Sequence, residues 1–128
     1  MTDKTRRQLR ISWPGGEVRA HLLDTSTADA LWSALPCDST ANIWGEEVYF
    51  ALPVRPALES DARQVVDPGT VCFWVDGASL ALPFGPTPIS RGEECRLVSP
   101  CNVLGSIDGD ARALAAVRDG QPIRLERL

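Results

Sequence analysis

Apolar and polar residues alternate in two runs near the start of the chain, at positions 7–13 and 17–23. Pro14-Gly15-Gly16 lies between them, and Pro and Gly are typical turn residues. Two runs of period two that flank a turn predict a β-hairpin. The side chains expected to point inward are Leu9, Ile11, Trp13, Val18, Ala20 and Leu22.

The pattern changes to a helical period after this hairpin. Residues 26–29 resemble a capping box, and Pro36 ends the predicted helix. Apolar residues recur here at the spacing i, i+3, i+4, i+7, so one apolar stripe should pack into the core. The stripe consists of Ala28, Leu31, Trp32 and Leu35. A second short helix is predicted over 110–118, with Gly120 at its C-terminal cap.

Short β-rich runs account for much of the remaining chain. They span 45–50, 71–75, 80–82, 103–107 and 123–128, whereas 62–66 is short and mixed, with Arg63 between apolar neighbours. Asp76-Gly77 is a hairpin turn signal between two of these runs. The last run alternates and is a natural partner for the N-terminal strand, a pairing that would remove the sheet edges. We therefore predict a mostly β fold, a closed antiparallel β-barrel capped by two short α-helices.

Length and charge narrow the classes of function. At 128 residues we expect one domain, spanning 1–128, with a substantial core. The net charge is −4 and the basic residues are scattered, which argues against nucleic acid as a partner. No apolar run approaches the roughly 20 residues that cross a bilayer, and the polar segment 1–10 has no signal-peptide pattern. We therefore expect a cytoplasmic protein that does not act at a membrane.

Motifs for cofactors, metals and nucleophilic catalysis are missing. The sequence has no glycine-rich phosphate-binding motif, so we expect no nucleotide cofactor. It has no C-x-x-C, and Cys95 and Cys101 are too far apart for a zinc knuckle, so we expect no metal. Without a secretory signal, the four cysteines are interpreted as reduced thiols. His21, the only histidine, lies on the polar face of its strand with no evident acidic partner.

The most site-like group lies in the segment 39–50. If residues 45–50 form a strand, Glu47 and Tyr49 share one face, and Val48 and Phe50 share the other and enter the core. Asn42 and Trp44 lie beside the first pair and complete a group that could bind a small polar ligand over an aromatic floor. The alternative is a structural network that ties down the loop between helix and strand. Glu46 is adjacent to Glu47, so the two point to opposite faces and cannot act as a carboxylate pair.

Several motifs resemble proteins of the cyclophilin fold. Residues 103–110 are similar to the cyclophilin strand that leads into the last helix. Residues 68–77, in which a strand lies between Pro68-Gly69 and Asp76-Gly77, are similar to the cyclophilin segment of the pattern Pro-Gly, strand, x-Gly. The resemblance is closer to small bacterial and archaeal cyclophilin-like proteins of no settled activity. It rests on the segments 41–50, 84–90 and 99–105 and covers nearly the whole chain.

Departures from true cyclophilins decide what the resemblance implies for function. The cyclophilin run that supplies the catalytic arginine has no counterpart, because the segment 42–50 in its place contains no Arg. Phe73 or Trp74 would stand where cyclophilins keep small residues beside the proline pocket. The resemblance thus implies a binding module for an unknown small molecule or peptide rather than a competent isomerase. Its expected cleft is lined by Asn42, Trp44, Glu47, Tyr49, Phe84 and Thr87.

Two other functions stay open at this stage. A weak peptidyl-prolyl cis-trans isomerase is suggested by the fold resemblance alone, which is a weak argument for an activity. A homodimer or other assembly is suggested by the stiff, proline-rich segment 84–88, because exposed apolar sequence often marks an interface.

Overall fold

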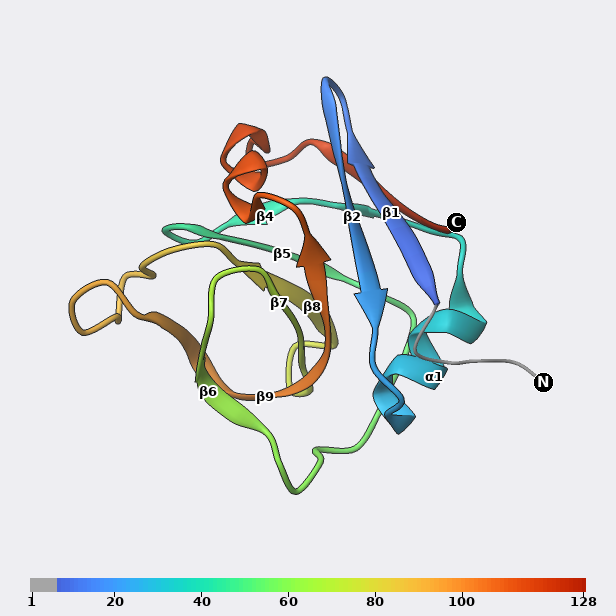
Figure 1. Cartoon of the computed structure of the whole chain (residues 1–128), viewed down its shortest axis with the longest axis horizontal. Coiled ribbons are helices and arrows are strands. Elements are labelled where there is room, and N and C mark those ends of the chain that lie inside the picture. The colour runs from blue at the N-terminus through green and yellow to red at the C-terminus, as the bar shows by residue number, and fades with distance from the viewer. Residues whose placement is uncertain (1–6) are drawn as a thin grey trace.

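The computed structural model describes residues 7–128, so part of the N-terminal segment 1–10 lies outside the described residues. Figure 1 shows a strongly curved sheet with short helical segments beside it. The elements are β1 (Gln8–Trp13), β2 (Gly16–Leu22), α1 (Ser26–Ala34), β3 (Cys37–Thr40), β4 (Asn42–Ile43), β5 (Glu47–Ala51), β6 (Arg63–Val66), β7 (Thr70–Trp74), β8 (Ser79–Pro83), β9 (Cys95–Asp108), a 3-10 helix (Ala111–Ala116) and β10 (Pro122–Arg127). Within residues 7–128, no helix has the length and apolar character needed to span a membrane.

The strands form one 10-stranded antiparallel sheet, but the sheet is not closed into a barrel. Its order is β3-β10-β1-β2-β9-β7-β8-β5-β4, with β6 paired to β9. The predicted pairing of the first and last strands is confirmed, since Ile11 lies opposite Leu125. The two ends of the path, β3 and β4, are separated in the chain by Ala41 alone. A hairpin between neighbouring strands usually needs at least two turn residues, so these two strands do not pair with each other. The prediction of a closed barrel is therefore wrong.

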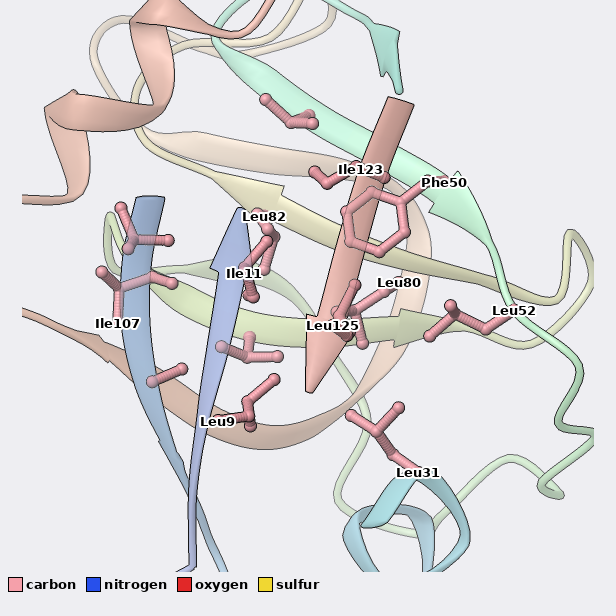
Figure 2. Packing of buried hydrophobic residues seen from close by; sticks show 14 of the residues in the cluster. Leu9, Ile11, Leu31, Phe50, Leu52, Leu80, Leu82, Ile107, Ile123 and Leu125 are labelled. Atoms are coloured by element: carbon pink, nitrogen blue, oxygen red, sulfur yellow. The ribbon is translucent and has the colours of Figure 1, made fainter. Parts of the chain in front are cut away.

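The main core fills the concave side of this sheet. Figure 2 shows inward side chains from β1, β10, β5 and β8 meeting there, with Phe50 among Leu80, Leu82 and Ile123. All six inward positions predicted for the N-terminal hairpin are buried. Complete burial of a large apolar side chain contributes about 1.5–3 kcal/mol, so this alternation is the main determinant of which strand face points inward.

The helical segments differ in detail from their prediction. Thr25, not Ser26, caps α1, because its hydroxyl accepts a hydrogen bond from the Ala28 amide at 3.1 Å. Leu31 of α1 points into the core as predicted (Figure 2). Trp32 is only half-buried, with the Arg127 guanidinium 5.0 Å from its ring centroid. The second helix is a single 3-10 segment that buries Leu114, and neither segment closes a barrel end because the sheet is open.

A second, smaller core lies on the opposite face of the sheet. β9 begins at Cys95, well before the predicted strand 103–107, and its first half pairs with β6. Figure 1 shows this long β9 ribbon curving around beside β6. Together the two strands cover side chains that point away from the main core. The second core consists of Val66, Cys72, Ala81, Cys95, Leu97 and Cys101.

Candidate functional site

The β4–β5 hairpin presents the predicted candidate side chains on one face. Asn42 pairs with Tyr49, and Ile43 pairs with Val48. Just beyond these pairs, the Trp44 amide donates to the Glu47 carbonyl at 3.0 Å, so Trp44 lies opposite Glu47. Paired residues of an antiparallel ladder point to the same side of the sheet. These four side chains therefore share the face of the second core. Val48 and Phe50 are fully buried on the other face, which confirms the predicted register of β5.

An aromatic pocket opens on this face. It has a volume of about 170 Å³, and its walls are Trp44, Tyr49, Trp74 and Val98. The rings of Tyr49 and Trp74 stand almost perpendicular, at 84° with centroids 6.4 Å apart, and so form two sides of a box. Val98 of β9 is 49% exposed although it lines the pocket. The aromatic pocket is thus a largely apolar hollow that is open to solvent.

Gly77 fixes the position of the Trp74 ring. A Cβ atom at Gly77 would lie 2.2 Å from Cε3 of Trp74, which is far inside van der Waals contact. Only glycine leaves room for the ring against the β7–β8 turn. Of the two bulky residues that the resemblance singled out, Trp74 forms a wall of the aromatic pocket and Phe73 is buried in the main core.

Glu47 is the least expected feature of the site. Alternation places it on the strand face away from the main core, yet Glu47 is only 5% exposed. Oε1 has no hydrogen-bond partner within residues 7–128. Burial raises the pKa of Glu47 from its ordinary value of 4.5 to about 7. Alternation placed this carboxyl correctly outside the main core, but it is buried near Cys95 and Cys101 of β9.

Three cysteine thiols of the second core lie near this carboxyl. Burial, reinforced by the Glu47 carboxylate, raises the pKa of Cys95 to about 11 and that of Cys101 to about 12. Burial also raises the pKa of Cys72, with smaller contributions from Cys101 and Glu47. All four cysteines are unpaired and buried. The three thiols near Glu47 therefore stay protonated at physiological pH.

The segments 41–50 and 84–90 pack against each other through their backbones. The Glu46 amide donates to the Pro86 carbonyl at 2.9 Å, and the Phe84 amide donates to the Glu46 carbonyl at 2.8 Å. Gly45 adopts φ +61°, and a Cβ there would lie 2.9 Å from Cα of Thr87. This close approach requires glycine at the turn between Trp44 and the two glutamates.

Phe84 and Thr87 do not line the aromatic pocket. Phe84 is buried in the main core, with the Arg112 guanidinium 5.6 Å from its ring centroid. The Thr87 hydroxyl donates to the Arg96 carbonyl at 2.5 Å. The segment 84–88 is thus largely buried rather than exposed, and Pro88 is its only exposed residue.

Asn42 lies beside the pocket without lining it. Its amide donates to the carbonyls of Thr40 and Tyr49 at 3.4 and 3.3 Å, which are long hydrogen bonds. The structure therefore brings Trp44 and Tyr49 together in the pocket, places Glu47 and Asn42 next to them, and separates Phe84 and Thr87 from them. For Asn42, these bonds agree with the alternative of a structural network.

Sequence reasoning missed two features. Nδ1 of His21 hydrogen-bonds Oδ1 of Asp108 at 2.7 Å, so the histidine does have an acidic partner, brought to it by β2–β9 pairing. Val98 was missed because the predicted strand began only at residue 103, although the apolar residues Cys95 and Leu97 alternate with polar ones. Neither His21 nor Asp108 lines the aromatic pocket. Within residues 7–128, no group of three or more His, Cys, Asp or Glu side chains is arranged to hold a metal ion.

Comparison with known proteins agrees with this architecture. Residues 7–126 match the Cyclophilin-like family. The solution structure of the hypothetical protein AF2241 from Archaeoglobus fulgidus is similar, with a TM-score of 0.84 and 35% sequence identity over 98% of each chain. No curated protein sequence matches. The chain therefore belongs to the Cyclophilin-like family.

Proposed function

We propose that this protein is a small-ligand binding module, and that the aromatic pocket is its binding site. The observation that carries the proposal is the concave hollow of about 170 Å³ walled by Trp44, Tyr49, Trp74 and Val98. Ligand sites are typically concave and lined by apolar and aromatic side chains with a few polar groups nearby. An apolar cavity of roughly 150 Å³ holds one benzene ring, so this pocket suits a group of about that size.

The pocket does not favour prolyl isomerase activity. None of its four lining residues is an arginine, the group that stabilises the twisted amide in cyclophilins according to the resemblance above. We expect a protease-coupled proline-peptide assay at high protein concentration to show no acceleration over background. Assembly into a homodimer is a separate expectation, and light scattering over a wide concentration range distinguishes it from a monomer.

A peptide is the second candidate ligand, because the aromatic pocket shares Trp74 with a second hollow of about 180 Å³. This second hollow is lined by Leu58, Trp74, Val75, Asp76, Ser99 and Pro100. Two hollows that share one residue suit two neighbouring side chains of an extended segment. A short peptide that shifts residues around both hollows, where a single-ring probe shifts only one, would favour this candidate.

NMR of the tryptophan indole N–H groups tests the pocket directly. The chain has four tryptophans, of which Trp44 and Trp74 line the pocket. Trp13 is in the main core and Trp32 is on α1, so their signals serve as internal controls. On titration with neutral benzyl alcohol, we expect the Trp44 and Trp74 signals to shift in a saturable way and the other two to stay in place.

A pocket-filling substitution provides the matched control. Val98→Phe places a ring at the pocket wall and should abolish the shifts, whereas Ile89→Phe changes another exposed apolar residue, 44% exposed, and should preserve them. Equal responses of all four indoles, or saturable binding that survives Val98→Phe unchanged, would contradict the assignment of this pocket.

A further inference from the structure

The walls of the aromatic pocket have the electrostatic character of a cation site. The faces of Trp and Tyr rings carry negative potential and attract ammonium and guanidinium groups. The nearly perpendicular rings of Tyr49 and Trp74 with Trp44 beside them form three aromatic walls, as in the cages that bind quaternary ammonium groups. No lysine or arginine is among the lining residues, so no internal cation occupies these walls.

Glu47 adds an uncompensated acidic group next to two of these walls. The Trp44 amide donates to its carbonyl just beyond the β4–β5 ladder, and it stands two residues before Tyr49 on the same strand face. Its side chain is 95% buried, and Oε1 has no partner within residues 7–128. Buried polar atoms almost always have a partner, so an unpartnered carboxyl oxygen requires an explanation. The charge of a cation in the adjacent pocket stabilises the carboxylate form through space, although it gives this buried oxygen no hydrogen bond.

We propose that the aromatic pocket binds an organic cation of the ammonium type, held by the faces of Trp44, Tyr49 and Trp74 and selected by the charge of Glu47. The proposal rests on the proposed function, because it assigns a ligand class to the same pocket. A trimethylammonium head is similar in size to a single ring and matches the volume of the hollow. Glu47 acts on the cation through space, since it lies beside the pocket walls rather than among them.

Among the charged and titratable groups of this region, Glu47 is the one whose charge changes near neutral pH. Those that face it or its neighbours are Cys72 on β7, Cys95 and Cys101 on β9, Arg63 on β6, and Glu46 and Asp67 at the adjoining turns. The three thiols stay protonated because their pKa values are raised. Burial raises the pKa of Glu47, and no nearby cation lowers it again. The Arg63 charge therefore does not neutralise this carboxyl.

Choline and its neutral isostere 3,3-dimethylbutan-1-ol test the charge preference on the full chain. They share one shape, so a difference in affinity at pH 8 measures the charge alone. We expect choline to bind at least about tenfold more tightly to the unchanged protein, as judged by the Trp44 and Trp74 indole signals. Glu47→Gln should remove most of this preference while the affinity for the alcohol stays constant. Choline affinity should also rise between pH 6 and pH 8 in the unchanged protein and stay flat in Glu47→Gln.

Glu46→Gln is the matched control for this experiment. It removes the same charge one residue away, on the other strand face, where Glu46 pairs with Arg112 at 2.8 Å. The choline preference should survive it. Equal affinity for choline and the alcohol, or a preference that Glu47→Gln leaves intact, overturns the cation proposal and leaves the pocket as a neutral binding site. Failure of both probes to shift the Trp44 and Trp74 signals overturns the cation proposal and the proposed function together. Amide spectra of each variant verify that it is folded.

Discussion

Trp44 and Glu47 face each other across the end of the β4–β5 hairpin, joined by a hydrogen bond of 3.0 Å from the Trp44 amide to the Glu47 carbonyl. The indole lines an open pocket, while the carboxyl beside it is 95% buried with one unpartnered oxygen. A ligand-sized hollow and an unsatisfied acid are therefore neighbours at the end of one hairpin, because a single backbone hydrogen bond joins the residue that lines the hollow to the residue that carries the acid.

Glu47 should make the protein less stable as the pH rises. Its pKa is about 7 in the folded state and near 4.5 when exposed, so the folded chain holds the proton more tightly. The stabilisation of the folded state that comes from this tighter proton binding is fully present below pH 4.5 and is lost as the pH rises to about 7. A difference of 2.5 units corresponds to about 3 kcal/mol. The free energies of unfolding of the unchanged protein and Glu47→Gln, measured in urea, should therefore change relative to each other by about 3 kcal/mol between pH 4.5 and pH 8. The change should stabilise the variant relative to the unchanged protein at high pH.

Glu46→Gln is the control for this pH dependence. The Arg112 guanidinium lowers the pKa of Glu46, so this carboxyl is ionised in folded and unfolded chains throughout pH 6–8. The variant should follow the pH profile of the unchanged protein in that range. Parallel profiles for the unchanged protein and Glu47→Gln would mean that the buried carboxyl finds a partner that this structure does not show.

Phe50→Ala should destabilise the protein far more than Tyr49→Phe. Phe50 is fully buried in the main core, so its truncation loses transfer free energy and leaves a cavity, about 3–5 kcal/mol together. Tyr49 is half-buried at the pocket, and loss of its hydroxyl should change the free energy of unfolding by less than about 1 kcal/mol. Thermal melts of both variants measure the difference. Comparable losses would place Tyr49, and not Phe50, on the core face of β5.

Gly45→Ala should destabilise the protein by disturbing the packing of segment 41–50 against segment 84–90. Gly45 has φ +61°, and an added Cβ would lie 2.8 Å from Cδ of Pro88 and 3.0 Å from the Pro86 carbonyl oxygen. Gly109 also has a positive φ, +81°, but a Cβ there meets no atom within 4 Å. Gly109→Ala should thus cost only the left-handed backbone strain of about 1–2 kcal/mol, and Gly45→Ala about 1–3 kcal/mol more. Equal chemical-denaturation midpoints for the two variants would argue against the close contact.

The cysteines should be unreactive in the folded protein. All four are buried, and burial raises the pKa of each thiol, to about 11 for Cys95 and about 12 for Cys101. The thiolate is the nucleophile, so its population at pH 8 is very small. Mass spectrometry after one hour with iodoacetamide should show no adduct on the native chain and four adducts after unfolding in urea. Fast labelling of one native cysteine would reveal local opening of the layer that covers it.

The sequence by itself determined which side chains of these strands point into the core and which point away from it. The alternation at 7–13 and 17–23 placed the N-terminal hairpin side chains correctly, and the same rule put Phe50 inward and Tyr49 outward on β5. The Asp76-Gly77 turn likewise predicted the β7–β8 hairpin. These features are local, since side-chain direction in a strand follows from backbone geometry over two residues.

Only the tertiary structure decided what covers the outward face. Glu47 is buried near Cys95 and Cys101 of β9, although nothing in segment 45–50 indicates that its polar side is covered. The open sheet, the His21–Asp108 hydrogen bond and the pocket wall at Val98 arise in the same way, from contacts between distant segments. Local pattern fixes the direction of a side chain. The solvation of its carboxyl depends on long-range strand pairing, which residue spacing does not encode.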